Sequence, residues 1–468
     1  MSDRSSGTRA ATARDVAALA LLLAAIAALL AASGMAGEVA LAKAGIVVAL
    51  VIASWAFGLF GEPVTTLIFF LLVVLFHVAK PETVFSGFAS TAWWLVFGGS
   101  ITAIAVQSTG LGRRLADLLL ARVSGAYWHA VTAVAVATVA LAFLMPSTNG
   151  RILLLMPIVL AFAERLGLAP GRPGHTGLVL TAAAGSYMPP TTILPANVPN
   201  SILLGAADSL YGVKLTYGPY FLLHFPILGA LKTVLLVWLI CRLCPEPQPL
   251  MPTRERDQGP PSRAERRLLM LLGVALLLFA TDSLHGVSPA WVALGTGLLC
   301  LLPAVGVLSV KSFAERANIV LLLYIAGILG LGAVVADSGL GARVSAWLMH
   351  LAPLAPGHTL WNVAILTAIG TGLSFLTTVT GVPAVLTPLA GEFATATGLP
   401  LLSVLMLQVV VFSTVLLPFQ SPPMMVALQL GGARLHEATR LCLALAALTM
   451  LLLWPLDYLW WRILGYLP

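Results

Sequence analysis

The stretch Met145-Pro-Ser-Thr-Asn-Gly-Arg-Ile-Leu-Leu-Leu-Met-Pro157 places a polar cluster inside a long apolar sequence. In hydrocarbon, backbone N–H and C=O groups without partners are costly, so a Pro-Ser-Thr-Asn-Gly break is tolerated only inside protein or beside a water-filled cavity. The stretch therefore predicts a membrane protein whose helices break around a polar site. In a transport protein, such a break is where the cargo binds.

The composition agrees with this interpretation. Of the 468 residues, 59% are apolar and 9% are charged, whereas soluble domains contain about 25% charged residues. A span takes about 20 residues, so the chain has room for on the order of ten to twelve helices. The net charge of +7 gathers in short connections, where it indicates topology. We expect the lipid bilayer as a partner and no nucleic acid.

A second break, Leu376-Thr-Thr-Val-Thr-Gly-Val-Pro-Ala-Val-Leu-Thr-Pro388, repeats the pattern about half a chain later. In both breaks a hydroxyl-rich turn ends in Gly, and Pro follows seven residues after it. Two more landmarks recur in the same order. Thr109-Gly-Leu-Gly-Arg-Arg114 matches Ser338-Gly-Leu-Gly-Ala-Arg343, and Asn197-Val-Pro-Asn-Ser-Ile202 corresponds to Ser421-Pro-Pro-Met-Met-Val426. The chain therefore contains two repeats.

The charges beside the repeated Gly-Leu-Gly differ between the halves. Arg113, Arg114 and Arg122 surround the first copy, whereas only Arg343 lies beside the second. The positive-inside bias places the first copy in the cytoplasm and leaves the second outside. The repeats then have opposite topology, as in many secondary transporters. A parallel repeat is the alternative.

A soluble stretch divides the chain near its middle. Residues 242–267 are rich in Pro, Gly and mixed charge, which is typical of a flexible or extended linker. We therefore expect four segments: an N-terminal cytoplasmic tail with the first span (1–43), a first transporter repeat (44–241), a cytoplasmic linker (242–267) and a second transporter repeat (268–468).

The two breaks supply hydrogen-bond donors without formal charge. In inverted-repeat carriers, the N-termini of half-helices present free N–H groups to anions, and unwound carbonyls hold cations. Such donors suit carboxylate or sulfate oxygens. The alternative for any single hydroxyl is a bond to its own helix or to a neighbouring helix. We expect two facing clusters of binding residues: Ser147, Thr148 and Asn149 in one, and Thr377, Thr378 and Thr380 in the other.

Arg151 directly follows the first cluster, and Val382 occupies the matching position of the second half. An arginine within the membrane indicates a functional site by default. It has two interpretations here: a counter-charge for an anionic substrate, or a residue that reaches solvent or the interface from the hairpin tip. The rest of the sequence shows no metal site and no nucleophile–base arrangement, so we expect no enzyme.

The residues Phe85-Ser-Gly-Phe-Ala-Ser-Thr-Ala-Trp-Trp-Leu-Val-Phe-Gly-Gly99, followed by Thr109–Arg114, resemble the first scaffold helix of the divalent anion/sodium symporter family. This family of the ion-transporter superfamily carries dicarboxylates, citrate and sulfate. The resemblance spans most of Ala44 to Leu430. It implies an all-α, polytopic inverted-repeat fold with two re-entrant helical hairpins and broken helices, elevator-type alternating access and a homodimer.

The family binds substrate carboxylates and sodium through a Ser-Asn-Thr signature at each hairpin tip. The matching positions are Ser147-Thr148-Asn149, where the order is permuted, and Thr378-Val379-Thr380, where the amide is absent. The resemblance implies Na⁺ at Ser147, Asn149, Thr378 and Thr380. It also implies substrate contacts in the later Pro-containing segments, at Pro199, Asn200, Ser421, Pro422 and Pro423.

The sequence thus predicts a secondary active transporter in the cell inner membrane. We expect it to carry a small di- or polyanion of the dicarboxylate or sulfate type, coupled to Na⁺ or H⁺, with no cofactor beyond the coupling ion. The alternatives are another permease of the same superfamily, of the arsenite type or the large subunit of a binding-protein-dependent system, and a membrane sensor that does not transport.

Overall fold

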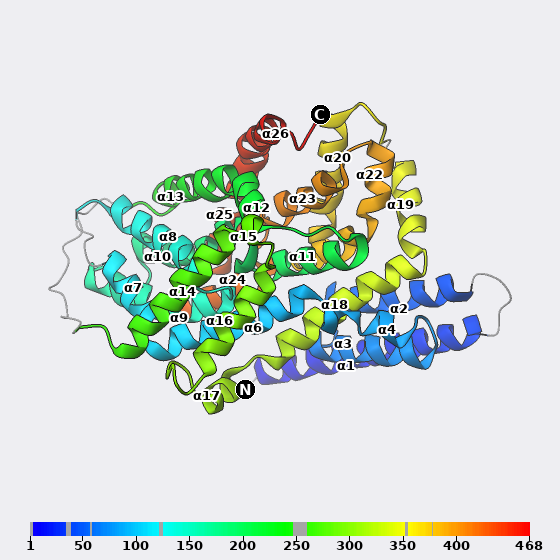
Figure 1. Cartoon of the computed structure of the whole chain (residues 1–468), viewed down its shortest axis with the longest axis horizontal. Helices are drawn as coiled ribbons and strands as arrows, with labels where there is room; N and C mark the ends of the chain where they lie inside the picture. Colours follow the sequence, from blue (N-terminus) through cyan, green and yellow to red (C-terminus); the bar gives the residue numbers. More distant parts are fainter. Residues whose placement is uncertain are drawn as a thin grey trace.

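The computed structural model describes residues 3–33, 39–56, 59–120, 125–246, 260–351, 354–376 and 378–468. Throughout these ranges the elements are helices, and no β-strand occurs in them. Figure 1 shows the helices gathered around several short, broken segments near the centre of the molecule. The predicted all-α architecture is confirmed.

Among the described residues, long apolar helices and shorter ones both contribute to the membrane domain. The shorter ones, such as α2 (Val39–Ala56) and α16 (Pro289–Leu301), are mostly apolar. Five segments are long and apolar enough to cross a bilayer: Val16–Ser33, Tyr127–Leu144, Tyr217–Leu243, Ile319–Asp337 and Leu435–Ile463. The chain is therefore a multi-pass membrane protein.

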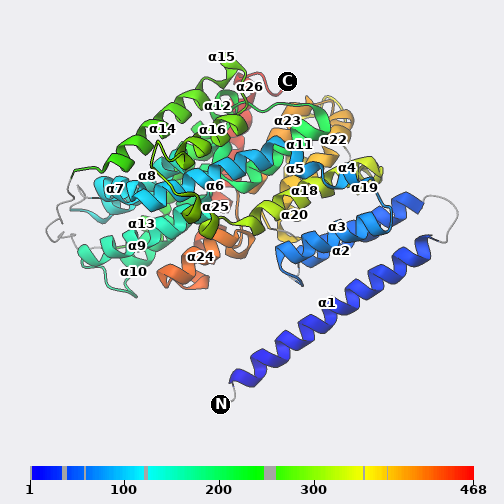
Figure 2. The same cartoon turned by 60° about the horizontal axis from the view of Figure 1, so that its bottom comes forward.

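The first span follows the predicted N-terminal tail. Its apolar part is Val16–Ser33, and the helix that contains it, α1, runs from Asp3 to Ser33. The polar part contains no proline, so nothing prevents the helix from continuing through it. Figure 2 shows α1 at one edge of the molecule, and it packs on α2.

The repeated Gly-Leu-Gly motif ends corresponding helices. α6 (Thr91–Thr109) stops at Gly110, whose φ is 81°, and α18 (Ile319–Asp337) is followed by Gly339, whose φ is 73°. Residues with a Cβ rarely adopt this left-handed conformation, which commonly ends a helix. The equivalence of the two motifs predicted from sequence is thereby confirmed.

The helices that follow these glycines lie at opposite ends of the molecule. Figure 1 shows α7 (Leu111–Leu120) at one end and α19 (Leu340–Leu351) at the other. This placement agrees with the opposite topology predicted for the two repeats.

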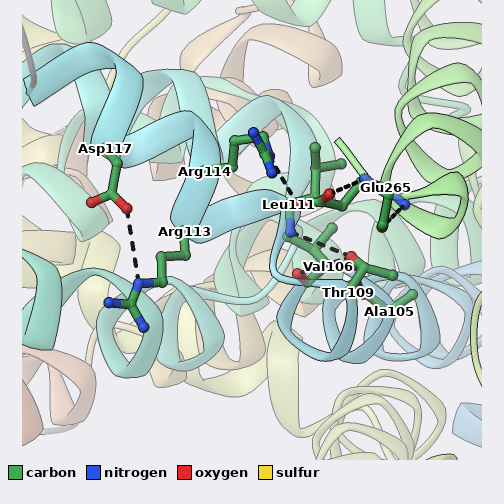
Figure 3. A network of polar contacts seen from close by, with 9 residues as sticks. Ala105, Val106, Thr109, Leu111, Arg113, Arg114, Asp117 and Glu265 are labelled. Carbon is green, nitrogen blue, oxygen red and sulfur yellow. Dashed lines mark hydrogen bonds and ion pairs between the residues drawn. The ribbon is translucent and has the colours of Figure 1, made fainter. Parts of the chain in front are cut away.

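The end of the linker lies beside α7. Arg114 forms an ion pair with Glu265 at the start of α14 (Arg263–Ala280), with Nε and Oε1 3.0 Å apart. Figure 3 shows this pair and the neighbouring pair of Arg113 with Asp117. The two segments predicted to be cytoplasmic thus share one side of the molecule. Arg122 and residues 247–259 of the linker lie outside the described residues.

The first polar break is the tip of a helical hairpin. α8 (Tyr127–Leu144) and α9 (Thr148–Arg165), which we call hairpin 1, are joined by only three residues. The break is shorter than predicted, because α9 already begins at Thr148, within the predicted Pro-Ser-Thr-Asn-Gly break. The helix restarts early because the Ser147 hydroxyl accepts a hydrogen bond from the Gly150 N–H at 3.1 Å and caps α9.

The second polar break forms a matching hairpin in the other half. We call residues 359–397 hairpin 2. Its first arm is α20 (Thr359–Leu376), and α21 (Gly381–Leu386) begins the return arm. Both re-entrant hairpins predicted from the resemblance are therefore present.

Each half also contains one broken helix. In the first half, α10 (Pro173–Tyr187) stops, residues 188–197 form 3₁₀ turns, and α11 (Val198–Tyr211) follows. We call residues 188–197 break 1. Its prolines lack the N–H that a continuing helix needs, as expected from the sequence.

The second broken helix has the same plan. α23 (Leu401–Phe412) stops, and α24 (Pro422–Gly431) begins after residues 413–421, which we call break 2. Asn197 and Ser421 are the corresponding N-cap residues of α11 and α24. The third pair of sequence landmarks therefore also corresponds in the structure.

A third kind of irregularity occurs in two spans. The span Tyr217–Leu243 contains a π-helical turn, η3 (Phe225–Leu231). A second π-helical turn, η6 (Thr449–Leu453), interrupts the last span. Such turns are frequent at functional sites. Pro226 lies in the first turn and removes one N–H from the regular helical pattern.

The two repeats interlock. α24 of the second half packs on α9 and α10 of the first, and α11 of the first half packs on α18 and α21 of the second. α6 packs most closely on α16, because Gly98 faces its backbone. A Cβ added to Gly98 would lie 2.5 Å from the carbonyl carbon of Ala293.

We expect Gly98→Ala to lower the stability of the protein by about 1–3 kcal/mol, because the added methyl group overpacks the contact between α6 and α16. The thermal unfolding midpoint of purified protein in detergent measures this. Gly273→Ala is the matched control, since an added Cβ there has no atom within 4 Å. An equal midpoint for the two variants would contradict the close contact.

Candidate functional site

Arg151 lies at the tip of hairpin 1 and is fully buried, with 0% of its surface exposed. Its guanidinium donates hydrogen bonds to three backbone carbonyls at chain breaks. The distances are 2.5 Å to Met145, 2.8 Å to Ser186 and 2.9 Å to Ala196. One side chain thus satisfies carbonyls from the hairpin and from both ends of break 1.

Asn197 completes this network at the end of break 1. Its side-chain oxygen accepts hydrogen bonds from the Thr148 hydroxyl and, at 3.0 Å, from Nη2 of Arg151. Its amide nitrogen donates to the Tyr187 carbonyl at 3.1 Å. The tip of hairpin 1 is therefore fastened to break 1 by buried hydrogen bonds.

The positive charge of Arg151 is balanced only by neutral oxygens in this network. Among the described residues, no carboxylate forms an ion pair with it. The interpretation in which Arg151 reaches solvent is wrong, because the side chain is enclosed. A buried cation without a carboxylate partner makes the surrounding site attractive to an anion. Its Nε–H has no hydrogen-bond partner in the described part of the chain.

Gln420 fastens hairpin 2 to break 2 in the second half. Its side-chain oxygen accepts from the N–H groups of Leu416 and Leu417, both at 2.8 Å, and its amide nitrogen donates to the Ser374 carbonyl at 2.7 Å. Its backbone carbonyl accepts from Val379 N–H at 2.9 Å. The neutral amide of Gln420 thus fastens hairpin 2 to its break, as the charged guanidinium of Arg151 fastens hairpin 1.

The hydroxyls of the second tip form a separate cluster. The oxygens of Thr378 and Thr380 are 2.6 Å apart, and Thr380 is 3.1 Å from the hydroxyl of Tyr324 on α18. Thr377, the third predicted residue of this cluster, lies outside the described residues.

The other two predicted residues of the first tip differ from Thr148 in their surroundings. Ser147 is half-buried and caps α9, whereas the Asn149 side chain is exposed. Asn149 therefore borders open space at the tip.

Two predicted residues of the broken helices have unsatisfied polar atoms. Asn200 is fully buried and donates to the Ile193 carbonyl at 2.8 Å, while its side-chain oxygen has no partner among the described residues. The buried Ser421 hydroxyl likewise lacks a partner there. Both atoms are available to a ligand or water. The predicted prolines open the adjoining helices: Pro199 in α11, and Pro422 and Pro423 in α24.

The two polar tips were predicted to face each other, and this stays a prediction. The structure connects each tip to the break of its own half and joins the helices that flank the breaks. The Tyr187 hydroxyl donates to the Phe412 carbonyl at 3.2 Å, and Lys232 Nζ donates to the Ser413 carbonyl at 2.6 Å. The centre of the candidate site is therefore the pair of breaks, with one hairpin tip attached to each.

Sequence reasoning missed several residues that support this site. It did not assign Asn197 and Gln420 as fastening residues, or Tyr324 as the partner of Thr380. Lys232 had a recognisable signal, since an ionisable residue in an apolar span indicates function. The partners of Asn197 and Gln420 depend on the tertiary fold and had no such signal.

Comparison with known proteins shows which family the chain resembles. The family model described as "Citrate transporter" matches residues 47–371. The chain belongs to the citrate transporter family. This membership confirms the resemblance to anion carriers of the ion-transporter superfamily, and it identifies a multi-pass protein of the inner membrane.

Individual relatives of this member of the citrate transporter family have low sequence identity to it. A membrane protein of Cupriavidus necator is 25% identical over 291 residues, which are 60% of this chain and 56% of the relative. The L-tartrate/succinate antiporter of Escherichia coli K12 is 27% identical over 215 residues, 42% of each chain. The matched region thus spans about half the length of these relatives.

A solved structure shares the fold. The YdaH transporter of Alcanivorax borkumensis, described as having an unusual topology, aligns with a TM-score of 0.52 and 16% sequence identity. The alignment covers 82% of this chain and 86% of that one. This likeness shows that the citrate transporter family member shares the fold of that transporter.

We expect Gln420→Ala to loosen break 2, because two partly buried N–H groups lose their acceptor, at up to about 1–3 kcal/mol each. Amide hydrogen exchange of residues 414–421 is expected to accelerate by at least tenfold. Gln429→Ala is the control, since Gln429 is exposed on α24. Unchanged exchange in the Gln420 variant would show that its amide does not hold the break.

Proposed function

We propose that this protein is a secondary active transporter that carries small di- or polycarboxylate anions across the inner membrane. The observation that carries the proposal is Arg151, a buried cation that joins hairpin 1 to break 1 without a carboxylate partner among the described residues. Its remaining donor and its uncompensated charge favour an anion in the adjoining space.

Neutral donors around the breaks extend this anion site. α9, α11 and α24 each begin at a tip or a break, so their N-terminal N–H groups and dipoles favour negative charge. Ser421 adds a buried hydroxyl without a partner in the described part of the chain. Several separated donors suit an anion with more than one oxygen-bearing group.

The names of similar proteins narrow the substrate class. The matching family is described as citrate transporters, and one relative is named an L-tartrate/succinate antiporter. We therefore place di- and tricarboxylates first and sulfate second for this chain, since all present oxygens to the same donors.

The coupling ion and the motion are further parts of the proposal. Na⁺ at Ser147, Asn149, Thr378 and Thr380 stays a prediction, and H⁺ is the other candidate. Hydrogen bonds between each tip and its own break would let a hairpin and a broken helix move together, which suits elevator-type alternating access. The homodimer is likewise proposed from the family resemblance.

Uptake by purified protein in sealed proteoliposomes tests the transport function. Labelled succinate, citrate and sulfate are offered under an inward Na⁺ gradient, an inward H⁺ gradient, or with unlabelled anion inside. We expect carboxylate uptake or exchange in at least one condition. Binding of these anions without any movement would identify a sensor, and neither binding nor movement would point to another substrate of the superfamily.

We expect Arg151→Gln to lower succinate uptake by about 100-fold, which corresponds to about 3 kcal/mol, because the charge and the fork of hydrogen bonds are both lost. Arg151→Lys keeps the charge but not the fork, so it should retain more uptake. Arg343→Gln, at an exposed position of α19, is the control. If the Arg151→Gln variant kept the succinate uptake and affinity of the wild type, Arg151 would not belong to the substrate site.

A further inference from the structure

Two apolar spans enclose an ionisable cluster that the carboxylate site does not use. Lys232 begins α13 (Lys232–Leu243) and is 1% exposed, and Asp457 lies in α26 (Trp454–Ile463) and is 2% exposed. His224, at the end of α12 (Tyr217–His224), is 0% exposed. Ionisable residues inside a membrane are costly and are usually functional.

These residues lie close together. α26, which carries Asp457, packs on η3, which ends at the residue before Lys232, and Oδ1 of Asp457 has no hydrogen-bond partner among the described residues. Trp461, one helical turn beyond Asp457, contacts His224 with ring centroids 5.6 Å apart. Both ring nitrogens of His224 lack partners in the described part of the chain. The cluster therefore has several buried atoms to which a proton or a water can bind.

The cluster touches both breaks of the substrate site. Lys232 Nζ donates to the Ser413 carbonyl of break 2 at 2.6 Å. On the other side, the ring of Tyr220 lies 4.7 Å from that of His224, and its hydroxyl donates to the Thr191 carbonyl of break 1 at 2.8 Å. A change of charge in the cluster is thus transmitted directly to the backbone that forms the carboxylate site.

Two π-helical turns lie beside the cluster of Lys232, His224 and Asp457. η3 immediately precedes Lys232, and η6 lies just before α26, which carries Asp457. The two π-helical turns pack against each other. Because π-helical turns lack the regular hydrogen-bond pattern, they let a helix shift where its charge state changes.

The other titratable groups around the cluster are different in kind or distant. Tyrosine hydroxyls stay protonated near neutral pH. Groups on the helices that pack along α13 gather around Cys244 at its far end, about 18 Å from Lys232 at 1.5 Å per residue. Cys442 of α25 (Leu435–Leu448) faces Met424, at 3.6 Å. The tyrosines nearby are Tyr187, Tyr217, Tyr220 and Tyr458, and the groups around Cys244 are Tyr127, Glu437 and Arg440. Arg462 lies in the last turn of α26, beyond Trp461.

Charge balance assigns this cluster a role. Arg151 and Lys232 supply two buried basic side chains beside the breaks, and Asp457 supplies one buried carboxyl group. An arriving dicarboxylate adds two negative charges, so a proton on Asp457 brings the loaded site close to neutrality. A nearly neutral core crosses the low-dielectric interior at lower cost than a charged one.

We propose that Asp457, with Lys232 and His224 beside it, is the proton-binding site that couples carboxylate movement to a proton gradient. The inference rests on the proposed carboxylate transport and adds its coupling ion. One proton binds the Asp457 carboxylate with the substrate and leaves after release on the other side.

Two transport assays separate coupling from transport. Counterflow exchanges labelled for unlabelled succinate with no net proton movement, whereas accumulation under an inward H⁺ gradient requires protons to enter and leave. Asn mimics a protonated carboxyl group. We therefore expect Asp457→Asn to keep the rate of counterflow within about threefold of wild type. Proton-driven accumulation should fall at least tenfold in the same variant. Asp337→Asn, exposed at the end of α18, should keep both.

Proton-driven accumulation that survives in Asp457→Asn overturns the inference. So does a folded variant that loses counterflow and accumulation together, because that pattern means a structural role. Wild-type uptake driven by Na⁺ alone overturns the coupling assignment and leaves the proposed transport function intact. A wild type that exchanges neither succinate nor citrate overturns the transport function itself.

A measurement on the wild-type protein tests the inference even if the Asp457→Asn variant does not fold. Neutralised succinate is added to purified protein in weakly buffered detergent solution containing a pH-indicator dye. We expect about one proton to be taken up per chain, and a smaller uptake in Lys232→Met. Succinate binding with no proton uptake near neutral pH overturns the inference.

Discussion

The structure depends on one constraint: backbone groups at helix breaks inside the membrane need hydrogen-bond partners. Four side chains supply them at the centre of this protein. Arg151 and Asn197 serve break 1, and Gln420 and Lys232 serve break 2. The partners come from both halves of the chain, so the interlocking of the repeats and the formation of the site have the same cause.

The two repeats resemble each other more in their backbone than in the side chains that hold the site together. Gly110 and Gly339 end equivalent helices with the same left-handed conformation. The first hairpin, however, is held to its break by a permanent charge, whereas the second is held by the neutral amide of Gln420. The two halves of the site therefore contribute unequally: one attracts an anion, and the other offers hydroxyls and carbonyls.

Landmarks of composition and spacing were enough to predict the hairpins, the breaks and the opposite orientation of the repeats, because glycines, prolines and charges act locally. They placed the end of the first break at Gly150, whereas capping by Ser147 restarts the helix at Thr148. They also did not identify Asn197 and Gln420 as the residues that hold the breaks. Which carbonyl a buried guanidinium reaches depends on contacts such as Arg151 with Ala196, which no sequence period encodes.

The packing of α24 against hairpin 1 has a consequence for biosynthesis. More than half of the chain separates Arg151 from α24, and at about 5–20 residues per second a ribosome needs on the order of tens of seconds to make it. During that interval hairpin 1 sits in the nascent protein without its final neighbour. Its guanidinium must then be sheltered by break 1 alone, or by the insertion machinery, until the C-terminal helices arrive.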